Sequence, residues 1–245
     1  MLNRFSLRYG ITGTALNWFR SYFSNRSQSV VINGASSSPC DLNEGVPQGS
    51  VMGPLCFSMY TAPLEDEIEK CGISKMVYAD DTQIYISIPK HTNHAQVIAQ
   101  IESCLCKIQE WSLQNSLKLN LGKTEVLHVR PRDKLSSSMS ITVSDIPILS
   151  ISKARDLGVI VQDDLGMKAH INNMCKSAAM GLHKIGKIRH VLDRSTTEKL
   201  VHAFIFSHLD CNNGLLLGVP EAQLTKLQRA QNSVASLVTH KRKFN

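Results

Sequence analysis

The sequence lacks several features that define common protein classes. It has no run of about 18 apolar residues, so it predicts no transmembrane helix and no membrane partner. Its first residues, MLNRFSLRYG, contain charged and polar interruptions in place of an apolar core, which is not the pattern of a secretory signal. Internal repeats and low-complexity linkers are also absent. We therefore expect a globular protein of the cytoplasm, the nucleus or both, and its 245 residues allow one large domain or two modest ones.

The seven cysteines form no C-x-x-C pair, and their number is odd. This pattern favours reduced thiols in a reducing compartment over a disulfide framework. His91 and His94 precede Cys104 and Cys106, which raises the alternative of a zinc site. Because their spacing fits no common zinc module, we favour thiols without metal.

Acidic residues are scarce in the last third of the chain. From Leu165 to Asn245 there are 12 Lys/Arg and 4 Asp/Glu, a net charge of +8, whereas Met1 to Asp164 carries 15 and 16, a net charge of −1. This asymmetry predicts a face that binds a polyanion, with a solvated basic helical region as the alternative. For the tail HKRK, His240–Lys243, we favour a solvated segment over a nuclear-entry signal.

The spacing of apolar residues divides the chain into an α+β region and a later helical region. In the first region, helices are expected over about 13–23 and 94–112 and directly after a Gly/Pro-rich loop at 45–55. Strands are expected within 28–34, 76–78 and 83–88, and two or three short strands around a proline turn within 138–162. After Asp164, helices are expected within 169–189, 195–209 and 221–238. Ser195 and Glu198 fit a capping box that would start the second of these helices.

Two aspartates, Asp80 and Asp81, stand side by side in the stretch MVYADDTQIYISI. The strand-forming runs on either side predict a hairpin with the aspartates at its bend. Adjacent carboxylates repel each other, so such a pair is either solvated or neutralised by a divalent cation such as Mg²⁺. A second pair, Asp163 and Asp164, lacks this context, and we predict a solvated turn there.

Further motifs make the metal site the better hypothesis for the first pair. The Gly/Pro-rich loop GVPQGSVMGPL precedes YADD, and LNLGKTEVL, ARDLGVIVQDDLGMKAHI and LVHAFIFSHLDCNNGLLLGVP follow it in order. With these motifs the whole chain resembles the reverse transcriptases of non-LTR (LINE-type) retrotransposons. In that resemblance GVPQGS is motif B and YADD is motif C.

The resemblance implies an α+β right-hand polymerase palm, with a β-hairpin, a sheet and packed helices, over residues 1–164. It implies an all-helical basic thumb over residues 165–245. The implied activity is RNA-directed DNA synthesis, a nucleotidyl transfer that uses Mg²⁺, an RNA template, a DNA primer and deoxynucleoside triphosphates.

The resemblance also assigns roles to particular residues. Asp80 is implied to be the main motif C metal ligand, and Asp81 its partner near the primer end. Tyr78 and Ala79 are implied to shape the hairpin beside the primer and the incoming nucleotide. The remaining residues are implied to lie near the template–nucleotide pair, as the motif B loop, or near the triphosphate, as the motif D lysine: Pro47, Gln48, Gly49, Ser50 and Lys123.

The family's third carboxylate, from motif A, is expected upstream of the first residue of this sequence, as are the fingers. Since motif A normally bridges both metals with the motif C aspartate, we expect this chain alone to be inactive or nearly so. Two other readings stay open. One is a non-catalytic remnant that binds RNA or DNA, and the other is a protein-interaction remnant that uses an exposed sheet edge.

Overall fold

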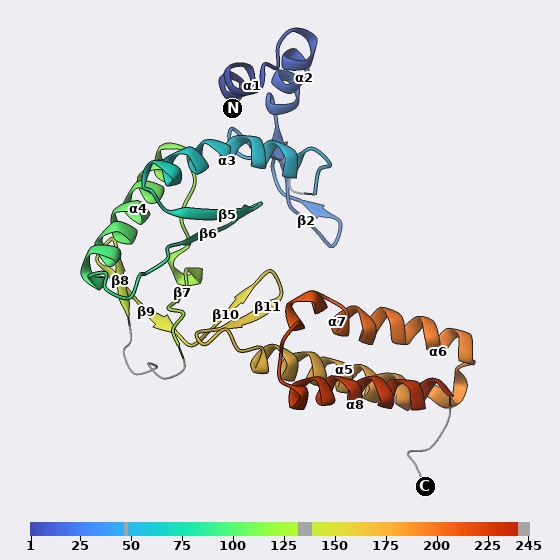
Figure 1. The fold of residues 1–245 in the computed structure, drawn as a ribbon. Helices are drawn as coiled ribbons and strands as arrows, with labels where there is room; N and C mark the ends of the chain where they lie inside the picture. Colours follow the sequence, from blue (N-terminus) through green and yellow to red (C-terminus); the bar gives the residue numbers. More distant parts are fainter. Residues whose placement is uncertain (47–48, 132–138, 240–245) are drawn as a thin grey trace. The chain divides into compact units, whose positions relative to one another are not determined.

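The computed structural model describes residues 1–46, 49–131 and 139–239. They form two compact units, Met1–Asn120 and Leu121–Asn245, and each contains helices and small sheets (Figure 1). The fold is therefore mixed α and β, as predicted. Within the described residues, no helix combines the length and the apolar character that a bilayer span needs. The predicted basic tail, His240–Lys243, lies outside the described residues.

The described part of the first unit contains these helices: α1 (Leu2–Tyr9), α2 (Gly13–Phe23), α3 (Gly53–Lys70) and α4 (His94–Gln114). The predicted helices at 13–23 and 94–112 are confirmed, whereas α1 was not predicted. Phe5 of α1 packs edge to face on Phe19 of α2, and both are buried with Cys56 of α3. Helix α3 also packs on α4. These contacts make α3 the central support of the unit.

Short hairpins complete the first unit. The predicted strand within 28–34 is instead broken into β1 (Ser27–Gln28) and β2 (Val31–Ile32). Strand β1 pairs with β4 (Cys40–Asp41), and β2 pairs with β3 (Ala35–Ser36). The chain reverses at Asn33–Gly34, where both residues have a positive φ. The second hairpin, β5 (Ser74–Tyr78) with β6 (Asp81–Tyr85), lies beside α3.

The second unit begins with small sheets. Strand β9 (Ile146–Ile151) pairs with β8 (Ser140–Val143) and β7 (Val126–Leu127), and β10 (Lys153–Asp156) pairs with β11 (Val159–Gln162). The described residues of 138–162 thus form four strands, where two or three were predicted. The predicted proline turn is also wrong, because Pro147 lies inside β9. The turn is at Ser144–Asp145, where both φ angles are positive. Pro147 is tolerated because β7 pairs only with Ser150 and Ile151, so the proline occupies an edge.

A helical bundle follows, built from α5 (Lys168–Ile188), α6 (Arg194–Val201), the π-helical turn η4 (His202–Phe206), α7 (Ser207–Leu209) and α8 (Glu221–Thr239). All three predicted helices are confirmed, the second as the continuous run α6–η4–α7. The predicted cap is wrong: Asp193, not Ser195, is the N-cap, and its carboxylate accepts a hydrogen bond from Thr196 N. The helix starts two residues earlier than the predicted cap implies, because this aspartate satisfies an exposed amide of the first turn.

Candidate functional site

The two aspartates lie where β5 turns into β6. Tyr78 and Asp81 form the last pair of the ladder, so Ala79 and Asp80 are the two loop residues, and the predicted hairpin is confirmed. Ala79 has a φ of 55°, in the left-handed region that favours glycine. Tyr78, Ala79, Asp80 and Asp81 are all exposed. The bend therefore presents both carboxylates and an aromatic ring to molecules outside the unit.

An inward-facing lysine fastens this hairpin to α3. Lys75 of β5 donates to the Glu65 carbonyl oxygen at 2.8 Å and to the Glu69 carboxylate at 2.5 Å, and its side chain is 11% exposed. A charge that is withdrawn from water needs such partners. The sequence carried one signal for it, because Lys75 stands between Ile73 and Val77 in the strand alternation. We did not identify this residue from the sequence, yet it determines where the aspartate bend is held on the unit.

The donor chemistry at the bend suits a hard divalent cation. Mg²⁺ takes oxygen ligands and commonly uses one or two carboxylates together with waters and substrate phosphates. Asp80 and Asp81 are exposed carboxylates of this kind. In the described ranges 1–46, 49–131 and 139–239, no three His, Cys, Asp or Glu side chains come together as a metal-binding group. These parts of the chain thus fit Mg²⁺ in ligand type and supply two protein carboxylates for it.

The loop that is predicted to be motif B is described in part, because Pro47 and Gln48 lie outside the described residues. Gly49 has a φ of 78°, a conformation that favours glycine over residues with a Cβ. The carbonyl of Ser50 accepts from the amide of Gly53, the first residue of α3. The hydroxyl of Tyr22 lies 2.8 Å from the Ser50 hydroxyl, so α2 also holds the end of this loop.

The second unit carries the other predicted groups. Lys123 is exposed at the end of the 3-10 turn η1 (Leu121–Lys123), and its role beside a triphosphate stays a prediction. Helix α5 contains no acidic residue, and its lysines are exposed: Lys168, Lys176, Lys184 and Lys187. Such a helix face attracts a polyanion such as a nucleic-acid backbone.

The second aspartate pair occupies a turn, as predicted, but the predicted solvation is wrong for Asp163, whose side chain is largely buried. The Asp163 carboxylate lies 4.0 Å from the Arg130 guanidinium, and both side chains are largely buried, at 14% and 13% exposed. The Asp164 carboxylate accepts from the amide of Gly166 at 2.7 Å. Each carboxylate therefore has a partner within the unit, whereas Asp80 and Asp81 face outward.

An arginine near the start of the chain connects three helices of the first unit. Arg4 of α1 donates to the Tyr60 carbonyl oxygen of α3 and, at 2.7 Å, to the Asn115 side chain beyond α4. Its guanidinium lies over the Tyr60 ring at 4.6 Å and the Trp111 ring at 5.8 Å. The Trp111 ring of α4 therefore packs within its own unit.

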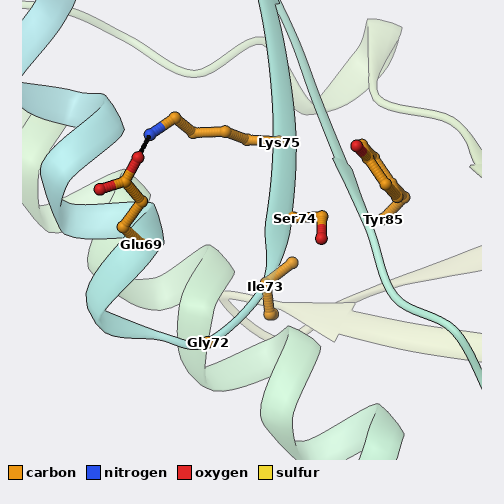
Figure 2. Close-up of a pocket in the computed structure, with 6 residues that line it drawn as sticks. All are labelled: Glu69, Gly72, Ile73, Ser74, Lys75 and Tyr85. Carbon is orange, nitrogen blue, oxygen red and sulfur yellow. Dashed lines mark hydrogen bonds and ion pairs between the residues drawn. The ribbon is translucent and has the colours of Figure 1, made fainter.

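Figure 2 shows a surface pocket of about 420 Å³ at the other end of the hairpin. Ser74 and Tyr85, which line it, are cross-strand partners at the opposite end of the ladder from Tyr78 and Asp81. The other lining residues come from the end of α3, from the turn that follows it and from β5: Glu69, Gly72, Ile73 and Lys75. The pocket is therefore separate from the aspartate bend.

Comparison with known proteins gives one family match and several relatives. The family model described as reverse transcriptase (RNA-dependent DNA polymerase) matches residues 4–161. The RNA-directed DNA polymerase from mobile element jockey of Drosophila funebris is 26% identical over 160 residues, which are 63% of this chain and 17% of that protein. The probable RNA-directed DNA polymerase from transposon BS of Drosophila melanogaster is 26% identical over 191 residues, 74% of this chain and 20% of that protein.

A third relative comes from another insect. The retrovirus-related Pol polyprotein from type-1 retrotransposable element R1 2 of Nasonia vitripennis is 24% identical over 149 residues, 59% of this chain and 35% of that protein. The chain thus spans well under half the length of these relatives. No solved structure matches the chain.

Proposed function

We propose that the chain forms the palm and thumb portion of an RNA-directed DNA polymerase, because it belongs to the reverse transcriptase family of LINE-type (non-LTR) retrotransposons. Residues 1–164 are proposed as palm and 165–245 as thumb, although the compact units divide at Asn120, inside the proposed palm. The observation that carries the proposal is the β5–β6 bend, which turns the carboxylates of Asp80 and Asp81 outward from a hairpin anchored on α3.

In this proposal, Asp80 and Asp81 hold Mg²⁺ near the primer end. When bound, the cation would stabilise the negative charge that develops on the attacking and leaving oxygens of nucleotidyl transfer. Tyr78 and Ala79 shape the surface that faces the primer and the incoming nucleotide. The backbone at Gly49 approaches the template–nucleotide pair closely because no Cβ intervenes, with Pro47, Gln48 and Ser50 beside it. Lys123 contributes positive charge near the triphosphate.

The proposed partners are an RNA template, a DNA primer and deoxynucleoside triphosphates. The acid-free α5 would contact phosphates of the template–primer without reading its sequence. Such binding releases counterions and weakens as salt rises, with a slope of roughly −0.9 per neutralised phosphate on duplex DNA. We expect Lys176→Gln/Lys187→Gln to reduce this slope by about two contacts, that is by roughly 1.8. The charge-matched variant Lys70→Gln/Lys107→Gln, on the first unit, leaves the slope unchanged.

The first experiment is Mg²⁺-dependent primer extension on an RNA template by the full chain. We expect little or no extension, because the described residues bring two protein carboxylates to the cation and no third. Asp80→Asn/Asp81→Asn is compared with Asp145→Asn, which changes an exposed turn aspartate whose left-handed φ suits asparagine. Extension that the double variant abolishes and the control keeps would assign the activity to the bend and refute the expected inactivity.

A second candidate function is a nucleic-acid-binding remnant without catalysis. It is favoured by the concentration of positive charge after Leu165 together with the two-carboxylate bend. Filter binding of the template–primer at several salt concentrations tests it in the same preparation. Absence of extension with salt-sensitive binding supports the remnant, whereas affinity that ignores salt refutes the phosphate contacts proposed for α5.

A further inference from the structure

Two cysteine side chains meet where α3 packs against α4. Cys71 is the residue at which α3 ends. Its thiol donates to the Glu67 carbonyl oxygen at 3.3 Å and also interacts with the Cys104 thiol in the middle of α4. The side chain of Gln100, one helical turn before Cys104, donates to the Cys71 carbonyl oxygen at 3.0 Å. Because residues four apart share a helix face, Gln100 and Cys104 both point at the end of α3.

The two sulfur atoms differ in their access to solvent. Cys104 is fully buried, at 0% exposed, whereas Cys71 is partly exposed. Burial, reinforced by the hydrogen bond with Cys71, raises the pKa of Cys104 to about 12. A thiol reacts as its thiolate, so Cys104 is slow to react with anything dissolved in water. Cys71 is the sulfur that a dissolved reagent reaches first.

The surface next to Cys71 is open. Gly72 and Ile73 directly follow Cys71 in the chain, and both line the pocket of about 420 Å³ (Figure 2). Gly72 has a φ of 67°, and its amide bonds back to the Glu69 carbonyl, so the turn is closed by its own backbone. A small reagent can therefore approach the end of α3 from the side of the β5–β6 hairpin.

We propose that Cys71 and Cys104 form a redox modification site, which a small disulfide of the glutathione class oxidises to an intrachain disulfide. In the first step, the Cys71 thiolate attacks one sulfur of the reagent. The S–S bond of the reagent breaks, and its other half leaves as a thiolate that takes up a proton. In the second step, Cys104 loses its proton to solvent and attacks the Cys71 sulfur of the mixed disulfide, and the second half of the reagent leaves as a thiol. Two protein thiols are oxidised by two electrons, and one small disulfide is reduced to two thiols.

The crosslink would close a loop from Cys71 to Cys104 that contains the whole β5–β6 hairpin. Restricting this loop in the unfolded chain stabilises the first unit. Because intracellular disulfides are usually transient, the site would be reduced under ordinary conditions and respond to oxidation. This inference does not rest on polymerase activity, so either one can fail without the other.

The test is peptide mapping by mass spectrometry of the full chain after exposure to oxidised glutathione and alkylation of the remaining thiols. We expect a peptide pair joined through Cys71 and Cys104, which dithiothreitol separates, and a higher melting temperature for the oxidised chain. Cys104→Ala should keep a glutathione adduct on Cys71, and Cys71→Ala should leave Cys104 unmodified. Cys106→Ala removes the exposed thiol nearest to Cys104 in sequence and should still form the crosslink.

Three results would overturn the proposal. The first is a glutathione adduct that persists on Cys71 of the intact chain, which would mean that Cys104 does not resolve it. The second is a crosslink from Cys71 to Cys106, and the third is modification of Cys104 in Cys71→Ala. Far-UV circular dichroism of each variant checks that the helices are intact. The partly exposed Cys71→Ala retains a test of the pair if the buried Cys104→Ala does not fold.

Discussion

Gly181 of α5 lies where the π-helical turn η4 crosses the helix, and replacing it with alanine should destabilise the bundle. A Cβ at this position would lie 2.8 Å from Cγ1 of Ile205 and 3.2 Å from the Phe204 carbonyl oxygen. Ile205 is fully buried, so its side chain has no free space into which it can move. Overpacking of this kind costs about 1–3 kcal/mol. The variant also gains up to about 1 kcal/mol of helix propensity, because glycine is a poor helix former.

The same helix offers a matched control, since a Cβ at Gly186 would meet nothing within 4 Å. Both substitutions gain helix propensity, so the difference in their free energies of unfolding isolates the clash, at about 1–3 kcal/mol. Urea unfolding of the two variants, followed by far-UV circular dichroism, measures this difference. Equal unfolding midpoints for Gly181→Ala and Gly186→Ala would refute the close approach of η4 to α5.

Other predictions concern buried polar groups and the start of α6. Arg189→Met removes a guanidinium that donates to three carbonyl oxygens at 2.7–3.1 Å, and we expect urea unfolding to show a loss of about 3 kcal/mol, against less than about 1 for the exposed Arg194→Met. Burial lowers the pKa of His170 below its ordinary 6.5, so stability is complete above that pH and should fall as pH drops below it. By thermal unfolding this loss is at most about 1.4 kcal/mol per pH unit, and a His170→Gln variant that kept the same slope would contradict it. The side-chain hydrogen bond from Thr196 lowers the pKa of Asp193 below 3.8, so the cap contributes above that pH and is lost as pH falls through the lowered pKa. Asp193→Ala should lower the melting temperature at pH 7 and have less effect in acid.

The elements that the sequence predicted best are those whose spacing is long and regular. The apolar residues from Val97 to Ile108 recur at helical spacing, which indicates α4 without tertiary information. The strand-forming residues on either side of YADD likewise indicate a hairpin. Helix α1 escaped prediction because it has only eight residues, and its stability comes from Phe5 in the core and from the contacts of Arg4 with α3 and α4. Packing of this kind overrides local propensity.

The errors at turns have a common physical origin. Proline is a common turn residue, but the structure places the reversal at Ser144–Asp145. Pro147 can lie inside β9 because the short strand β7 pairs only with Ser150 and Ile151 and needs no amide from the proline. Ser195 fits the capping-box pattern, but in the structure the carboxylate of Asp193 accepts the hydrogen bond from the amide of Thr196. Sequence patterns identify candidates for such roles, and the geometry of neighbouring strands and amides selects among them.

For the candidate site, the sequence indicated the aspartate bend but not its support. Lys75 supports the hairpin because Glu69 of α3 lies across from it, and Tyr22 supports the loop because it lies beside Ser50. The sequence alone does not determine these two contacts. The inward position of Lys75 was the available signal. A lysine between apolar alternates of a strand implies an acidic partner, and Glu65 and Glu69 supply it one helical turn apart.

Within the described residues, β5 and β6 pair only with each other, and this determines how fast their amides exchange with deuterated water. In an antiparallel pair, residues alternate between hydrogen-bonded and non-bonded positions, so only every second amide of each strand points at the partner. The remaining amides face outward along the ribbon. We therefore expect protection with a period of two along both strands, with exchange through local opening of the hairpin. Helix α5, which is packed along its length in the bundle, should exchange only on global unfolding.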